Sequence, residues 1–184
     1  MTGGAPAAAD ALHAPGIWRR LACMVYEGVL LFGVLMIAGY LYSSLTQQRH
    51  ALQGRTGLQA FLFVVLAIYF TWFWSRGGQT VAMKTWHIRL VRADGAPVPQ
   101  PRALARYLLA WVWFVPALVT VRWHGLASAA TVFGTLLAGV AVYAALALLR
   151  PDRQFWHDAV CGTRLVHWRT PPRPAPSAAA ESPR

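Results

Sequence analysis

The chain has 184 residues, of which 57% are hydrophobic and 12% are charged, whereas soluble domains carry about 45–50% apolar and about 25% charged residues. This balance excludes an ordinary soluble domain and predicts an integral membrane protein. The net charge of +11 at pH 7 would suggest nucleic-acid binding in a soluble protein, but here Lys and Arg gather at the ends of apolar runs, where anionic lipid headgroups attract them. We therefore expect the lipid bilayer, and not nucleic acid, to be the partner of this charge.

The two ends of the chain are predicted to be disordered cytoplasmic tails. Residues 1–16 contain no Lys or Arg and no apolar run of the length that a signal peptide needs. Residues 170–184 are rich in Pro, Ala and Ser, a composition that cannot bury a core. Residues 17–169 form the predicted membrane domain. Its cysteines, Cys23 and Cys161, have neither metal-ligand spacing nor the density of a disulfide scaffold, so we predict no chemical role for them.

Four apolar runs are long enough to cross a bilayer, which requires about 20 mostly apolar residues in a helix. The predicted spans are residues 21–46, 58–75, 104–121 and 126–149. The third run contains Pro116, where we expect a kink. Only residues 122–125 separate the third run from the fourth, so these two should form a tight antiparallel pair. Glycines of the first and fourth runs are the expected positions of close helix packing: Gly28, Gly33, Gly39, Gly134 and Gly139.

The positions of Lys and Arg predict the orientation of the chain, because cytoplasmic loops carry an excess of these residues. Fourteen of them fall on one side of the predicted membrane and three on the other. The first side holds Arg19, Arg20, Arg76, Lys84, Arg89, Arg92, Arg102, Arg106, Arg150, Arg153, Arg164, Arg169, Arg173 and Arg184; the second holds Arg49, Arg55 and Arg122. We predict a multi-pass membrane protein with both termini in the cytoplasm.

A polar stretch, "GGQTVAMKTWHIRLVRADG" (residues 77–95), interrupts the apolar runs. It is not a phosphate-binding loop, because Met83 stands where such a loop needs its second glycine and because an apolar span precedes it. Residues 79–86 instead predict a short helix at the membrane surface, with Thr80 as the N-cap and Lys84 reaching toward headgroups.

The rest of this stretch alternates apolar and polar residues, which predicts a strand over residues 88–91 and a turn at Asp94–Gly95. A single strand is not stable by itself. The segment "GTRLVHW" has the same alternation, and we predict that its residues 163–166 pair with the first strand. The predicted fold is therefore an all-α integral membrane protein with four transmembrane helices and a small cytoplasmic cap made of a short helix and a β pair.

Four blocks of the sequence, in this order, resemble the RDD family of bacterial inner-membrane proteins: "WRRLACMVYE", "GGQTVAMKTWHIRLVRADGAPV", "RALARYLLAW" and "DRQFWHDAVCGTRLV". The resemblance extends over residues 18–168. It implies that Arg20 is the family's arginine at the start of the first helix and that Asp158 is its C-terminal acidic residue. Glu27 stands where the family usually has an aspartate, so the carboxylate is kept on a longer side chain. Transport of unknown ligands has been suggested for this family.

Glu27 is the acidic residue inside a predicted span, where an ionisable group costs about 2.5–3.5 kcal/mol and usually faces a partner within the bundle. Two arginines are alternative partners, Arg20 two helical turns earlier and Arg106 near the start of the third span. A carboxylate in this place could bind a proton or cation during transport, or it could fasten the first helix to the cytoplasmic layer. We favour the fastening role, and hence a structural or accessory function, with ion or small-solute transport as the alternative.

Histidines and acids offer little for enzyme chemistry. His157 and Asp158 are adjacent and could ligate a metal ion, but His87 and His167 would join them only if the predicted sheet brought them together. With four acids outside the tails, at positions 27, 94, 152 and 158, few residues could act in acid-base catalysis. We predict no enzyme activity, no cofactor and no metal, and we expect a homo-oligomer or a membrane partner protein. The candidate functional residues are Arg20, Glu27, Gly78, Gln79, Thr80, Lys84, Arg89, Arg106, His157, Asp158 and Gly162.

Overall fold

A computed structural model describes residues 14–47, 55–112, 114–115, 119, 123, 128–149 and 154–168. In chain order its elements are α2 (Ile17–Leu45), α3 (Arg55–Arg76), α4 (Val81–Thr85), β1 (Ile88–Arg92), α5 (Gln100–Trp111), α7 (Ala129–Leu148), α8 (Trp156–Val160) and β2 (Thr163–His167). We refer to α4, β1, α8 and β2 together as the cap.

Three helices among the described residues, α2, α3 and α7, are long and apolar enough to cross a membrane. They correspond to the first, second and fourth predicted spans. The third predicted span lies partly outside the described residues, since the structure describes α5 and only parts of the chain between residues 113 and 127. The predicted kink at Pro116 and the turn at 122–125, apart from Trp123, also lie outside them.

Two of the observed helices begin before the apolar runs that predicted them, whereas α7 lies within its predicted run. Helix α2 begins at Ile17 and α3 at Arg55, three or four residues before the predicted spans, because a backbone hydrogen-bonded as a helix continues through polar residues at the membrane boundary. This extension places Arg20 inside α2, on the same face as the buried Cys23 and Glu27.

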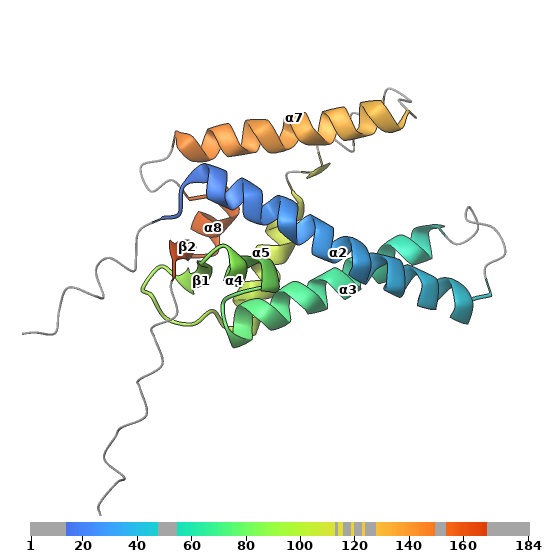
Figure 1. Ribbon diagram of the computed structural model, residues 1–184, viewed down its shortest axis with the longest axis horizontal. Coiled ribbons are helices and arrows are strands. Elements are labelled where there is room, and N and C mark those ends of the chain that lie inside the picture. Colours follow the sequence, from blue (N-terminus) through green and yellow to red (C-terminus); the bar gives the residue numbers. More distant parts are fainter. Residues whose placement is uncertain are drawn as a thin grey trace, which may run out of the picture.

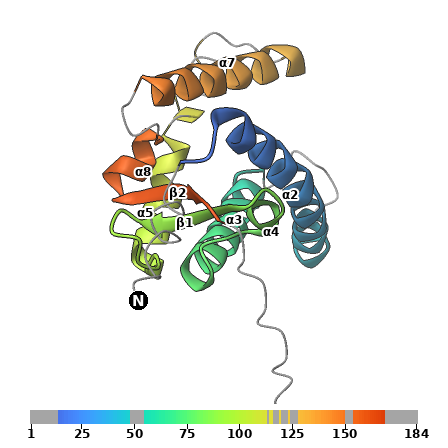
Figure 2. The same ribbon diagram turned by 60° about the vertical axis from the view of Figure 1, so that its left-hand side comes forward.

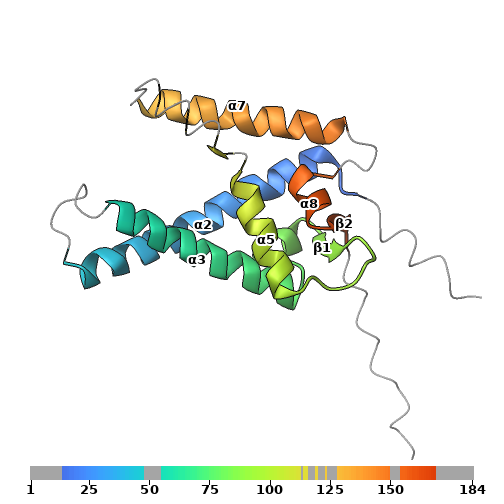
Figure 3. The same ribbon diagram turned by 180° about the vertical axis from the view of Figure 1, so that it is seen from behind.

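The cap lies at one end of the molecule, and the long helices extend away from it (Figure 1). Helices α2 and α3 run in opposite directions and cross, and α7 lies along the other side of α2. Figure 2 shows the cap gathered at the ends of α2 and α3, and Figure 3 shows α5 passing from the cap across α3 toward α7. Many apolar side chains of α2 and α7 are exposed, among them Val29, Phe32, Phe133 and Leu137, as expected for surfaces that face lipid.

The two strands of the cap pair antiparallel, with Ile88 opposite His167 and Leu90 opposite Leu165. This confirms the predicted β pair, and each strand is one residue longer than predicted. Ile88, Leu90 and Val166 are almost completely buried. The predicted turn is also present, since Gly95 has a φ of +84° and its N–H donates to Arg92 O at 2.8 Å.

The predicted surface helix is α4, and its N-cap is Thr80 as expected: the Thr80 side chain accepts a hydrogen bond from Met83 N. Gly78, just before it, has a φ of +68°, a conformation that L-residues rarely adopt. Its carbonyl accepts a 2.7 Å hydrogen bond from Leu90 N. The glycine therefore lets the end of α3 turn back against β1.

The predicted packing role of the span glycines is wrong for four of them. A Cβ added at Gly28, Gly33, Gly39 or Gly134 would meet no atom within 4 Å. These positions face open space, because the contacts between α2, α3 and the cap are made by larger side chains.

Candidate functional site

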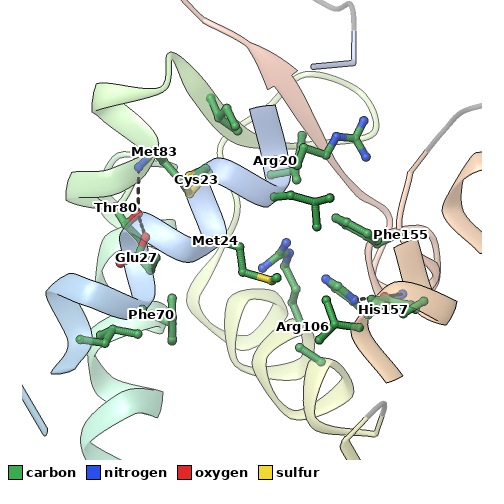
Figure 4. A pocket seen from close by; sticks show the side chains of 18 of the residues that line it. Arg20, Cys23, Met24, Glu27, Phe70, Thr80, Met83, Arg106, Phe155 and His157 are labelled. Atoms are coloured by element: carbon green, nitrogen blue, oxygen red, sulfur yellow. Dashed lines mark hydrogen bonds between the residues drawn. The ribbon is translucent and has the colours of Figure 1, made fainter. Parts of the chain in front are cut away.

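A pocket of about 390 Å³ lies at the cap end of the molecule, between α2, α3, α5, α7 and the cap. Its volume falls within the range of about 300–1,000 Å³ that is usual for small-molecule sites. Most of its lining is apolar. The side chains with charged or strongly hydrogen-bonding groups in it, several of them labelled in Figure 4, are Arg20, Glu27, Thr80, Arg106, Tyr143 and His157.

Glu27 lies on α2 at one side of this pocket with 8% of its surface exposed. Its carboxylate accepts hydrogen bonds from Tyr69 OH at 2.7 Å and from the Thr80 hydroxyl. Tyr69 is on α3, and Thr80 at the same time accepts from Met83 N at the start of α4. One carboxylate therefore joins α2 to α3 through Tyr69 and to the cap through Thr80; Figure 4 shows the link to Thr80.

The second buried carboxylate, Asp158 of α8, is completely buried. Arg106 of α5 donates from Nε to Asp158 Oδ1 at 2.6 Å, and the Thr163 hydroxyl lies 3.2 Å from the same oxygen. Burial, the largest single cause, would raise the pKa of Asp158, but the charge and hydrogen bond of Arg106, together with His157 and the Thr163 hydroxyl, outweigh it and hold this pKa below its ordinary value. The Arg106 guanidinium also lies over the Trp74 ring, 4.2 Å from its centroid.

His157, next to Asp158, connects the cap to α7. Its Nδ1 shares a short hydrogen bond with Tyr143 OH. The imidazole stacks on Phe155, with ring centroids 5.7 Å apart and planes 9° from parallel. Burial lowers the pKa of His157 to about 4, although the charge of Asp158 acts in the opposite direction. The imidazole is therefore neutral at physiological pH.

The two arginines considered as partners of Glu27 have other contacts. Arg106 pairs with Asp158. Arg20 donates from Nε to Pro15 O at 2.8 Å, and its guanidinium lies over Phe155, 5.5 Å from the ring centroid. Within the described part of the chain, Glu27 bonds to the hydroxyl groups of Tyr69 and Thr80. The end of the Arg20 side chain points away from Glu27 (Figure 4).

Other predicted residues build the cap and do not line the pocket. Gln79 donates to Ile88 O at 2.7 Å and so holds the entry to α4 against β1. Lys84 is exposed. The Arg89 guanidinium lies 4.5 Å from the centroid of Trp168. Gly162 has a φ of +59° in the turn between α8 and β2, and its carbonyl accepts from Ala93 N at 2.9 Å.

The cap sheet brings His87 and His167 together, with stacked rings 6.3 Å apart between centroids. No group of three or more His, Cys, Asp or Glu side chains suited to a metal ion occurs within the described part of the chain. The two stacked rings and His157 therefore do not form the three-histidine arrangement considered from the sequence.

Sequence analysis did not identify several residues that build the site and the cap. Tyr69 and Tyr143 each hold a buried ionisable group, and Gln154 exchanges two hydrogen bonds with the Leu165 backbone, at 3.2 and 3.0 Å. The two tyrosines could have been predicted to bond to polar side chains, because they lie inside apolar runs and a buried phenol needs a hydrogen-bond partner. The role of Gln154 could not be predicted, because its contact with Leu165 depends on how the chain folds back after α8.

Comparison with protein-family models finds one described as the RDD family, which matches residues 14–162. No curated protein matches the chain, and no solved structure does. The matched range includes both buried carboxylates, both arginines that line the pocket, and the cap up to the start of β2.

Proposed function

The chain belongs to the RDD family of membrane proteins, and we propose that it is a structural or accessory module of the bacterial inner membrane in which buried polar bonds fasten the cap to the membrane helices. One observation carries this proposal: each buried carboxylate joins a helix to the cap. Glu27 links α2 to α3 and Thr80, and Asp158 links α8 to α5. Buried carboxylates are costly unless they are paired, and here both are used in such links.

Four membrane crossings are supported by the pairing of the strands. Strands β1 and β2 are hydrogen-bonded to each other, so they lie on the same side of the membrane. The chain between them must cross the membrane an even number of times, and α7 is one candidate crossing. The second crossing belongs to the run at residues 104–121, of which α5 is the described beginning.

Charge supports a cytoplasmic cap. Among the described residues, nine basic residues lie on elements at the cap end and Arg55 begins α3 at the opposite end. The nine are Arg19, Arg20, Arg76, Lys84, Arg89, Arg92, Arg102, Arg106 and Arg164. By the positive-inside rule this end faces the cytoplasm, together with both termini.

The proposed role is not enzymatic. The buried carboxylates are engaged in bonds that hold elements together, and His157 is neutral and stacks against the Tyr143 and Phe155 rings. Groups committed in this way are poorly suited to exchange protons with a substrate. A second copy of the chain or another membrane protein is the proposed partner, through the exposed apolar faces of the long helices.

Ion or small-solute transport is a second candidate, favoured by the pocket itself. Glu27 lines a cavity that it shares with Arg106 and His157, and a carboxylate in such a place can take up a proton or a cation. In this alternative the bonds from Tyr69 and Thr80 would open when the carboxylate binds its ion.

Proteoliposomes separate the two functions. Purified wild-type protein, Glu27→Gln and Tyr69→Phe would be compared at equal amounts of folded protein for proton, Na⁺ and K⁺ flux. The structural proposal expects no flux above empty vesicles and a lower melting temperature for both variants, because each loses a bond of the Glu27 link. Flux that Glu27→Gln abolishes and Tyr69→Phe retains would overturn it in favour of transport.

A further inference from the structure

The pocket extends as an apolar slot between α2 and α7. Its walls there are Gly28 and Leu31 of α2, Gly139 and Val140 of α7, and Ala110 and Phe114 on the α5 side. Of the residues of α7, only Ala144 and Ala147 are buried. Helix α7 lies beside α2 (Figures 1 and 2), and most of its residues are not buried.

The position of the slot suits the acyl chain of a lipid. Helices α2 and α7 are both candidate membrane spans, so the space between them lies at the depth of the hydrocarbon. Gly28 and Leu31 follow Arg20 by eight and eleven residues, or about 12 and 17 Å along the helix axis. A molecule whose polar end lies at Arg20 would extend its apolar part along these residues.

The cap end of the same pocket is basic. Arg20 and Arg106 both line it, against one lining carboxylate, Glu27, which already accepts two hydrogen bonds. Asp158 does not line the pocket, and its ion pair with Arg106 is made through the Nε of that arginine. The end of the Arg106 side chain points into the pocket between Met24 and His157 (Figure 4). The nine basic residues at this end exceed the three acids described in the structure, Glu27, Asp94 and Asp158.

We propose that this pocket is a lateral binding site for one anionic phospholipid, with an acyl chain in the slot between α2 and α7 and the phosphate bound by Arg20 and Arg106. A guanidinium group presents paired N–H donors that match phosphate oxygens. The excess of basic residues favours a headgroup with net negative charge over a zwitterionic one. Arg20 thereby has a role beyond its contacts with Pro15 and Phe155.

The glycines that line the slot provide the test. An added Cβ at Gly28 meets no atom within 4 Å, so Gly28→Leu places a larger apolar side chain at the slot without changing a charge. Gly33→Leu is the matched control, because Gly33 is on the same helix, has the same open space and does not line the pocket. A second pair on α7 is Val140→Trp, which fills the slot, and Val142→Trp, at an exposed position outside it.

Native mass spectrometry of protein taken from nanodiscs of phosphatidylglycerol or phosphatidylcholine would count the retained lipid. We expect one phosphatidylglycerol per chain, about tenfold weaker retention of phosphatidylcholine, and a loss of about tenfold in phosphatidylglycerol retention for the slot-filling variants. Gly33→Leu and Val142→Trp should retain lipid as the wild type does. Should Gly28→Leu fail to fold, the Val140→Trp pair decides.

Three results would overturn the proposal. One is equal retention of phosphatidylglycerol by the slot-filling variants and their controls, which would place the lipid elsewhere. Another is a lipid-free dimer that the slot-filling variants dissociate, which would place a second copy of the chain in the slot. Equal retention of the two lipids would remove the assigned role of the arginines and so also contradict it.

Discussion

At the scale of single residues, the pair formed by Arg106 and Asp158 is almost completely buried, with side chains 8% and 0% exposed. Removing one partner of a buried ion pair leaves the other charge without compensation and costs about 3–5 kcal/mol. We expect Asp158→Asn to lower the free energy of unfolding by this amount, measured by denaturant titration in detergent micelles.

Asp94 provides the control for this change. It forms a salt bridge with Arg92 at 2.8 Å, but the two side chains are 37% and 53% exposed, and exposed pairs contribute about 0–1 kcal/mol. Asp94→Asn should therefore be close to wild type in stability. If the two variants lost the same stability, burial would not be what makes the Asp158 pair important.

His157 predicts a dependence of stability on pH. Its pKa is lowered from 6.5 to about 4, so between these pH values the unfolded chain binds a proton that the folded protein excludes. The free energy of unfolding should be unaffected by this group above pH 6.5 and should fall by up to about 3 kcal/mol as the pH falls to about 4. The contribution of Asp158 is lost only below its ordinary pKa of 3.8.

Melting temperatures of His157→Gln at pH 7, 6, 5 and 4 would check this. The variant should be less stable than wild type at pH 7, because it loses the bond to Tyr143, and should show a flatter decline toward pH 4. His87→Gln, at a histidine outside the pocket, is the control and should keep the wild-type slope. An unchanged slope in His157→Gln would rule out His157 as the group that titrates.

At the scale of elements, Gly78 determines how α3 connects to the cap. A Cβ there would lie 2.4 Å from Leu90 O, and the φ of +68° is strained for any other residue. We expect Gly78→Ala to lower the free energy of unfolding by about 1–3 kcal/mol. Gly77→Ala is the matched control, since a Cβ at Gly77 meets nothing within 4 Å. Limited proteolysis near residues 77–80 that is equal in both variants would argue against this role.

At the scale of the whole molecule, the proposed four crossings can be read by cysteine labelling. In a chain with Cys23→Ala and Cys161→Ala, single cysteines would be placed by Gln47→Cys, Asp94→Cys or Ser128→Cys. An impermeant maleimide added to spheroplasts should label positions 47 and 128 and leave position 94 unlabelled until the membrane is opened. Labelling of positions 94 and 128 from the same side would contradict a crossing between β1 and α7.

The sequence by itself determined the local features of this protein. Apolar run length predicted the regions of α2, α3 and α7, because crossing hydrocarbon requires a helix of that length whatever surrounds it. Alternation predicted both strands, and Thr80 was identified as the N-cap of α4, because these signals act between residues close in the chain. The match to the RDD family likewise confirmed a resemblance carried by short ordered blocks.

The tertiary structure alone decided the partners of the charged residues. Glu27 had two candidate arginines in the sequence but bonds to Tyr69 and Thr80, which are 42 and 53 residues away. Arg106 pairs with Asp158 across 52 residues, and the apolar slot exists only where α7 lies beside α2. Hydrophobicity and backbone propensity are properties of a segment, whereas a hydrogen-bond partner or a cavity depends on which distant side chains the fold brings within reach.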